Sequence, residues 1–166
     1  LNFYLVGLPD NAVKESQQRI RASFKNNNYH FPGKEITVNV APADIRKEGS
    51  VFDLPIALGI LAASEQLNTN RLKNFLIVGE LSLDGSIQAT RGVLAIALQA
   101  KAEGYVGIIV PEANASEASV IEGLEVYGIK TLKQAVEFLN GETDEQPFLP
   151  PAQDSMGVNA YEIPVD

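Results

Sequence analysis

The sequence predicts an α+β domain, a two-layer α/β arrangement in which a mixed sheet packs against helices. Residues 36–40 alternate apolar and polar side chains with a period of two, which is the pattern of a half-buried strand. The pair Asp84–Gly85 predicts a hairpin turn, and a purely parallel, doubly wound sheet would contain no such hairpin. Residues 54–63 form a helical stretch that is apolar on almost every side, so it should lie inside the fold.

Composition restricts the class of protein. Hydrophobic residues make up 45% of the 166, and no apolar run approaches the ~18 residues of a membrane span, so we expect a cytoplasmic chain that does not contact a membrane. There is no cysteine and only one histidine, His30, which leaves little basis for a metal site. Six acidic residues and no Lys or Arg lie in residues 141–166, so only −2 of the net charge of −8 belongs to residues 1–140. No broad basic surface for nucleic acid is therefore expected.

The first half of the chain is predicted to hold two strands and two helices. Asp10 is a suitable N-cap for a helix that ends at the asparagines 26–28. One face of this helix is apolar, and another face carries basic residues. In order, the expected elements are a strand at residues 3–6, a helix at 11–26, a strand at 36–40 and a buried helix from about 54 to 66.

The start of the buried helix can be interpreted in two ways. Ser50 and Asp53 have the spacing of a capping box. Alternatively, Asp53 is the N-cap and Pro55 lies in the first turn, where its missing N–H costs little. We favour the second, because the first would place Pro55 where a donor to the Val51 carbonyl is needed. In either case a helix N-terminus follows a charged turn, and this is a candidate interface or anion-binding turn. Its residues are Arg46, Lys47, Glu48, Gly49 and Ser50.

The second half is predicted to alternate strands and helices, ending in an acidic linker. The run at residues 106–110 is continuously apolar and indicates a buried strand. The other expected elements are strands at 75–80, 86–89 and 124–127, and helices at 92–103, 112–122 and 132–139. From Gly141 the sequence becomes rich in proline and acidic, so we expect a domain over residues 1–140 and a linker over 141–166.

Three kinds of chemistry can be weighed from the residues. Neither a phosphate-binding loop nor a dinucleotide-binding glycine motif occurs, so we expect no nucleotide cofactor in this chain. Ser50 beside Lys47 has the residue types of a serine–lysine peptidase, although a serine before a helix is usually a cap. Lys14, Arg21 and Lys25 form a basic stripe that could follow a phosphate backbone, and three exposed charges are also ordinary for a solvated helix face.

Several segments of the chain resemble the magnesium-chelatase-like AAA+ ATPases of the ComM/YifB type. The resemblance extends over about residues 3–140. Its motifs are Val6-Gly7-Leu8-Pro9-Asp10, Ile36-Thr37-Val38-Asn39-Val40, Lys47-Glu48-Gly49, Asp53-Leu54-Pro55-Ile56-Ala57, Gly79-Glu80-Leu81-Ser82-Leu83-Asp84-Gly85 and Arg91-Gly92-Val93. The resemblance implies the amino-terminal Lon-protease-like domain of such a protein, with the fold of the Lon proteolytic domain.

The resemblance also implies that protease chemistry is missing. Lon carries its serine in Lys-Asp-Gly-Pro-Ser-Ala-Gly, and the serine position falls on Val51, one residue after Ser50. Lon carries its lysine in Gly-Gly-Leu-Lys, and the lysine position falls on Leu94. A one-residue shift at a helix start turns a side chain by ~100°. We therefore expect a domain that is not an enzyme.

For the parent protein, the resemblance implies an ATPase that remodels DNA during natural transformation or recombination. ATP and Mg would bind to an AAA+ module beyond the acidic linker. The expected partners are that module and neighbouring subunits of a homo-oligomer, with hexamers typical of the class. DNA is a further expected partner, bound weakly by this chain alone.

Overall fold

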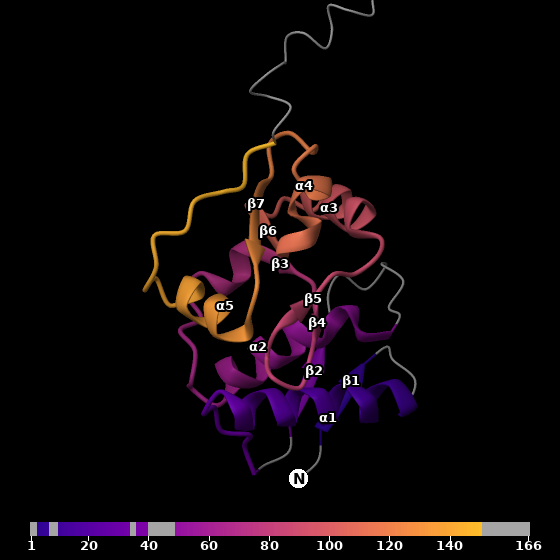
Figure 1. Cartoon of the computed structure of the whole chain (residues 1–166), viewed down its shortest axis with the longest axis vertical. Coiled ribbons are helices and arrows are strands. Elements are labelled where there is room, and N and C mark those ends of the chain that lie inside the picture. Colours follow the sequence, from indigo (N-terminus) through magenta and orange to yellow (C-terminus); the bar gives the residue numbers. More distant parts are fainter. Residues whose placement is uncertain (1–2, 7–9, 34–35, 40–48, 151–166) are drawn as a thin grey trace, which may run out of the picture.

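The computed structural model describes residues 3–6, 10–33, 36–39 and 49–150, which are drawn as coloured ribbon in Figure 1. The helix α1 (Asp10–Asn26) crosses one end of the molecule. Beside it lies a parallel pair of strands, β1 (Phe3–Val6) and β2 (Ile36–Asn39), aligned Phe3 to Ile36. These bounds agree with the predicted strands and helix to within one residue.

The helix α2 (Asp53–Ala63) runs through the interior, as its sequence predicts. Leu54, Leu58 and Leu61 are fully buried, Pro55 and Gly59 are partly exposed, and Ala63 at the end of the helix is exposed. A 3-10 helix, η1 (Gly49–Phe52), leads directly into it. Neither predicted N-cap is confirmed, because Phe52 is the N-cap residue and no side chain caps the helix, but Pro55 does lie in the first turn, as the favoured interpretation predicted. The reason is that the Asp53 side chain is held by groups elsewhere in the fold.

A three-stranded parallel sheet has the order β3-β6-β7. Its strands are β3 (Phe75–Ile77), β6 (Gly107–Pro111) and β7 (Glu125–Ile129). The helix α3 (Val93–Ala102) packs on β6, and the short helices η3 (Glu112–Asn114) and α4 (Ala115–Ala118) join β6 to β7. In Figure 1, α5 (Leu132–Leu139) lies on the other side of the sheet from α3 and α4. Helices on both faces explain why every residue of β3 and β6 is buried.

The strand predicted at residues 75–80 is divided between two sheets. After β3 the chain leaves the parallel sheet, and β4 (Glu80–Leu81) pairs antiparallel with β5 (Ile87–Gln88). Gly79 stands at the division, and a Cβ there would lie 2.9 Å from Cγ2 of Ile87. The predicted Asp84–Gly85 hairpin is confirmed, and the mixture of parallel and antiparallel sheets confirms the α+β class.

The C-terminal helix is anchored to the sheet by an aromatic cluster. The ring of Phe138 lies 4.6 Å from that of Tyr127 and 5.5 Å from that of Phe75. The guanidinium of Arg71 covers the Phe138 ring at 4.4 Å and donates to the Phe138 carbonyl. Residues 132–139 form the helix that their sequence predicts.

Beyond α5, residues 141–150 run back along the outside of the molecule towards the start of β7 (Figure 1). The backbone N–H of Phe148 donates to the carbonyl of Val126 at 2.7 Å. This segment therefore follows the edge of the sheet. The division of the chain at residue 140 stays a prediction.

Candidate functional site

The start of α2 is organised around one buried carboxylate. Asp53 is 1% exposed and lies between α1, α2 and β4. Its Oδ1 accepts from Ser16 Oγ at 2.7 Å and from Arg19 Nη2 at 3.0 Å. Its Oδ2 accepts from Arg19 Nε at 2.6 Å and from the backbone N–H of Leu81 at 3.1 Å. Three elements that are distant in sequence thus meet at one side chain.

The protein environment shifts the pKa of both Asp53 and Arg19. Burial raises the pKa of Asp53, against the opposing effects of Arg19, Ser16 and the Leu81 amide. The hydrogen bonds to Asp53 raise the pKa of Arg19, which keeps its guanidinium charged. A carboxylate offers about four acceptor positions, and four donors occupy them here. Asp53 therefore holds the fold together and has no acceptor left for acid–base work on a substrate.

The two positions that the resemblance to Lon predicts for the dyad, Val51 and Leu94, lie at helix starts. Val51 is in η1, half-buried and packed against the core, and its carbonyl accepts from the Gly79 N–H at 2.7 Å. Leu94 is in the first turn of α3 and is 39% exposed. Ser50 is half-buried in η1. Residues 46–48 of the predicted charged turn lie outside the described residues, and Gly49 is the first residue of η1.

A second polar cluster surrounds the start of α3, and it could not be predicted from the sequence. The Asn114 side chain accepts from the Thr90 N–H and donates to the Thr90 carbonyl, both at 3.0 Å. The same amide donates to Glu117 Oε1 at 3.3 Å. Glu117 Oε2 in turn accepts from the N–H of Leu94 at 3.3 Å. A carboxylate thus stands beside Leu94, the position predicted from the resemblance to correspond to the Lon lysine.

The predicted basic stripe is exposed along α1. Lys14, Arg21 and Lys25 are spaced by seven and four residues, which places them on one face of the helix. The guanidinium of Arg21 lies 4.2 Å from the centre of the Phe31 ring. This face is on the outside of α1, whereas Ser16 and Arg19 point to Asp53 from its inner side.

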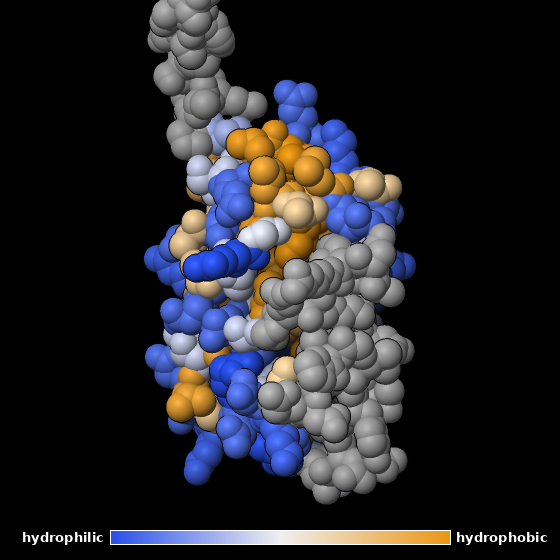
Figure 2. All heavy atoms as spheres, turned by 90° about the vertical axis from the view of Figure 1, so that its right-hand side faces the viewer, coloured by the Kyte–Doolittle hydropathy of each residue, from blue (hydrophilic) through white to orange (hydrophobic). Residues whose placement is uncertain are grey.

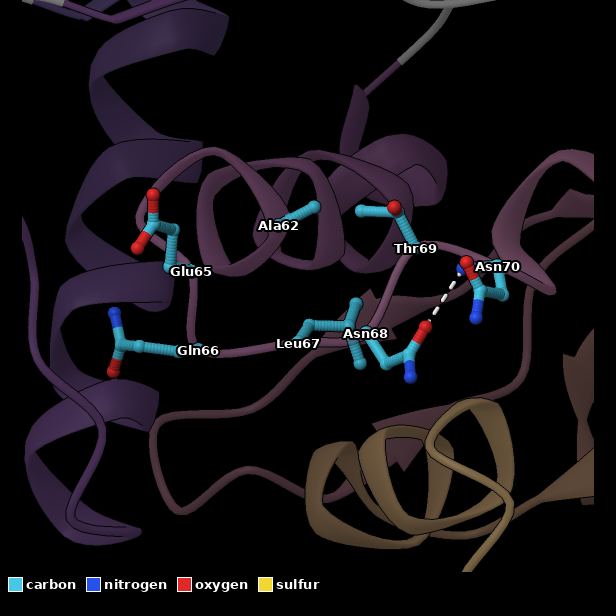
Figure 3. A pocket seen from close by; sticks show the side chains of 7 residues that line it. All are labelled: Ala62, Glu65, Gln66, Leu67, Asn68, Thr69 and Asn70. Atoms are coloured by element: carbon cyan, nitrogen blue, oxygen red, sulfur yellow. Dashed lines mark hydrogen bonds between the residues drawn. The ribbon is translucent and has the colours of Figure 1, made fainter.

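An open hollow follows the C-terminal end of α2 (Figure 3). Its lining consists of Ala62, Glu65, Gln66, Leu67, Asn68, Thr69 and Asn70. Some polar groups of this loop bond within it, as in the bond from the Asn70 N–H to Asn68 Oδ1 at 2.8 Å, and the Gln66 side chain donates to the His30 carbonyl at 2.7 Å. None of the predicted site residues lines the hollow.

Across residues 3–6, 10–33, 36–39 and 49–150, no three His, Asp or Glu side chains are grouped as metal ligands. Every helix there is too short or too polar to cross a membrane.

Comparison with known proteins agrees with this architecture. Residues 1–114 match the family described as subunit ChlI of Mg-chelatase. The chain is 47% identical over 140 residues to the competence protein ComM of Haemophilus influenzae, covering 84% of this chain and 27% of that protein. It is 42% identical over 137 residues to the Escherichia coli protein YifB, covering 82% of this chain and 27% of that protein. The archaeal Lon protease of Methanocaldococcus jannaschii is 31% identical over 103 residues, or 62% of this chain and 16% of that protein.

Proposed function

Because the chain belongs to the family of the ChlI subunit of Mg-chelatase, we propose that it is a non-catalytic, Lon-like assembly domain of a longer AAA+ ATPase. The proposal rests on one correspondence: the resemblance to the Lon motifs assigns the two dyad positions to aliphatic side chains, Val51 and Leu94. An aliphatic side chain can neither attack a carbonyl nor take up a proton. The fold persists without the chemistry that its relatives of the Lon type perform.

The buried carboxylate supports a scaffolding role. By the same correspondence, Asp53 falls on the second glycine of the Lon motif, two residues after the nucleophile position. Its bonds to Ser16, Arg19 and Leu81 fix the start of α2 to α1 and β4. A helix start held in this way favours a rigid surface for partners over a site that must rearrange around a substrate.

For the longer protein we propose ATP-dependent remodelling of DNA, such as branch migration, in natural transformation or recombination. The name of the Haemophilus relative, a competence protein, supports this choice. The chain spans 27% of the length of that relative, so ATP and Mg would bind to a module outside this chain. Its partners would be that module and neighbouring subunits, in a hexamer.

The assembly role is tested in the longer protein by reversing the charged turn. We expect Arg46→Glu with Lys47→Glu to reduce ring size in light scattering, or to reduce DNA-stimulated ATP hydrolysis. Lys73→Glu with Lys133→Glu is the matched control, since both side chains are exposed and the change in charge is the same. Unchanged assembly and unchanged stimulation in the first variant would remove the turn from the mechanism.

The absence of catalysis is tested with a serine-reactive probe. The purified chain should remain unlabelled and should not cleave casein-type substrates, because the nucleophile position is Val51. Labelling at Ser50 that disappears in Ser50→Ala would instead support the peptidase alternative.

DNA contact by α1 is a second function that can coexist with assembly. It is favoured by the exposure of Lys14, Arg21 and Lys25 on one helix face. Lys14→Gln with Lys25→Gln should weaken DNA binding by the longer protein and lower its salt dependence by about one unit per lost phosphate contact. Lys73→Gln with Lys133→Gln should leave the salt dependence unchanged, and equal effects of the two pairs would argue against a specific α1 contact.

A further inference from the structure

The chain reverses direction directly after α5. Gly141 has a φ of 77°, in the left-handed region that suits glycine. Its N–H donates to the Phe138 carbonyl at 3.1 Å, and the N–H of Glu142 donates to the Glu137 carbonyl at 2.9 Å. This pair of bonds is the Schellman motif, which ends a helix and turns the chain back. Residues 142–150, which we name the strap, therefore run back along the outside of the molecule to the start of β7 (Figure 1).

The strap is extended and lies with one side against the domain. Thr143, Glu145 and Pro147 are half-buried, and the residues between them are exposed. This period of two is that of an extended chain with one face covered. The far end is fixed by the bond from the Phe148 N–H to the Val126 carbonyl at 2.7 Å. Because β7 is the last strand in the order β3-β6-β7, the strap occupies an otherwise open edge of the sheet.

Few polar contacts hold the strap in this position. Within the described part of the chain, the bond of Phe148 is the one main-chain hydrogen bond that joins residues 143–150 to the domain. The side-chain bond from Gln134 Nε2 to Glu145 Oε2 is long, at 3.5 Å. Thr143 Oγ1 is buried and has no hydrogen-bond partner among the described residues, which disfavours the docked position because the hydroxyl loses its water. Docking also costs the conformational entropy of each residue that it orders.

Apolar burial adds little to the docking of the strap. Of its side chains that face the domain in the middle of the strap, Pro147 is the apolar one, and Leu149 is 71% exposed. Other apolar side chains of the domain stay in water, such as Leu98 of α3, which is 53% exposed. Figure 2 shows hydrophobic side chains gathered in open view at the end of the molecule near α3, so the strap leaves that surface uncovered. The strap therefore closes without the main driving force of folding.

We propose that the strap is a reversible closure, which docks on the edge of β7 and opens about Gly141 while the rest of the domain stays folded. In the closed state, the chain that continues after residue 150 begins beside the start of β7. In the open state it begins at the end of α5, and the nine residues of the strap add a tether of up to ~32 Å. The strap thus sets two distances between the domain and whatever follows it. This inference concerns the chain itself and does not depend on the proposed function.

Single thiols can report the opening, because the chain has no cysteine. Thr143→Cys places a thiol where the buried hydroxyl lies, and Asp144→Cys places one on the exposed side of the strap. Ser23→Cys places one in the core, since Ser23 is fully buried. The rate of each thiol with a disulfide reagent is divided by the rate of the same variant in urea, which cancels differences in intrinsic reactivity. Thr143→Cys should react about tenfold more slowly than Asp144→Cys, as expected if the strap is closed in about nine of ten molecules, and at least about a hundredfold faster than Ser23→Cys.

The bond that closes the strap is tested with proline. Adding Phe148→Pro to Thr143→Cys removes the N–H that donates to Val126, and the protection should fall from about tenfold to about twofold. Leu149→Pro is the matched control, because the Leu149 N–H has no acceptor among the described residues. The control should keep the protection of about tenfold.

Four outcomes would overturn the proposal. Equal rates for Thr143→Cys and Asp144→Cys would mean that the strap does not close. A rate for Thr143→Cys as low as that for Ser23→Cys would mean that the strap opens only when the domain unfolds. Equal protection in Phe148→Pro and Leu149→Pro would mean that the β7 edge does not hold the strap. Protection that disappears on hundredfold dilution would show that the strap docks on a second copy of the chain.

Discussion

Arg19 and Asp53 are separated by 34 residues, and Arg19 Nε lies 2.6 Å from Oδ2 of Asp53 in a two-pronged ion pair. The two side chains differ in their access to water, since Arg19 is 21% exposed and Asp53 is 1% exposed. The pair connects the middle of α1 to the first residue of α2. Removing Arg19 and removing Asp53 should therefore lower the stability of the fold by different amounts.

We expect Arg19→Ala to destabilise the chain more than Asp53→Ala. Removing one partner of a buried pair costs about 3–5 kcal/mol when the other charge stays buried. Arg19→Ala leaves Asp53 buried without its main partner, whereas Asp53→Ala leaves a guanidinium that can turn towards water. Urea unfolding of wild type, of both single variants and of the double variant measures the loss in the free energy of unfolding. The double variant should lose less stability than the sum of the two, and simple additivity would contradict the coupling.

Leu58→Asp should prevent soluble folding. Leu58 is fully buried in α2, and a carboxylate there would lack a hydrogen-bond partner. The cost is comparable with the entire ~5–15 kcal/mol stability of a domain. Ala63→Asp is the control, because residue 63 is exposed at the end of the same helix. Circular dichroism and soluble yield should separate the two variants, and similar melting temperatures would mean that α2 is not the buried helix.

The stability of the folded chain should fall at high pH because of the ionisation of Tyr127. Burial, together with the hydrogen bond to Glu125, raises the pKa of Tyr127 to about 12. The unfolded chain releases this proton near the ordinary pKa of about 10, whereas the folded chain keeps it. Between these two values the folded state binds more protons, so its stability decreases as pH rises.

Chemical unfolding over this pH range tests the effect, with Tyr127→Phe as the comparison. The phenylalanine variant lacks the titrating group, so its stability should decline less steeply between about pH 10 and about pH 12. Identical slopes would show that Tyr127 ionises equally readily in both states.

Local sequence patterns were sufficient to predict the elements that need no specific long-range contact. The apolar run of α2 needs only a hydrophobic environment. The helix over residues 132–139 is capped by Thr131, whose side chain accepts from the Gln134 N–H at 3.0 Å. Both could be predicted from sequence because propensity and burial act in the same direction. The hairpin at Asp84–Gly85 is of the same kind.

Long-range polar contacts could not be predicted in this way. Asp53 has the residue type and position of an N-cap, and three partners at distant positions engage its carboxylate instead. One signal was present, since Ser16 and Arg19 share the buried side of α1 with Ile20, where a charged residue needs a partner. The identity of that partner depends on tertiary structure. For Glu117 beside Leu94 no comparable signal exists in the sequence.

Restoring the Lon dyad by Val51→Ser with Leu94→Lys should fail to create a peptidase. A lysine that serves as a general base must lose its proton, and a nearby carboxylate favours the charged ammonium form. Glu117 Oε2 lies 3.3 Å from the backbone nitrogen of residue 94, so it is positioned to pair with a lysine introduced there. Hydrolysis of a fluorogenic casein substrate should stay at the level of Val51→Ala with Leu94→Lys. Adding Glu117→Gln removes this obstacle, and turnover confined to that triple variant would assign the block to Glu117. Turnover in the double variant itself would show that the scaffold still supports catalysis and that only the two side chains were lost.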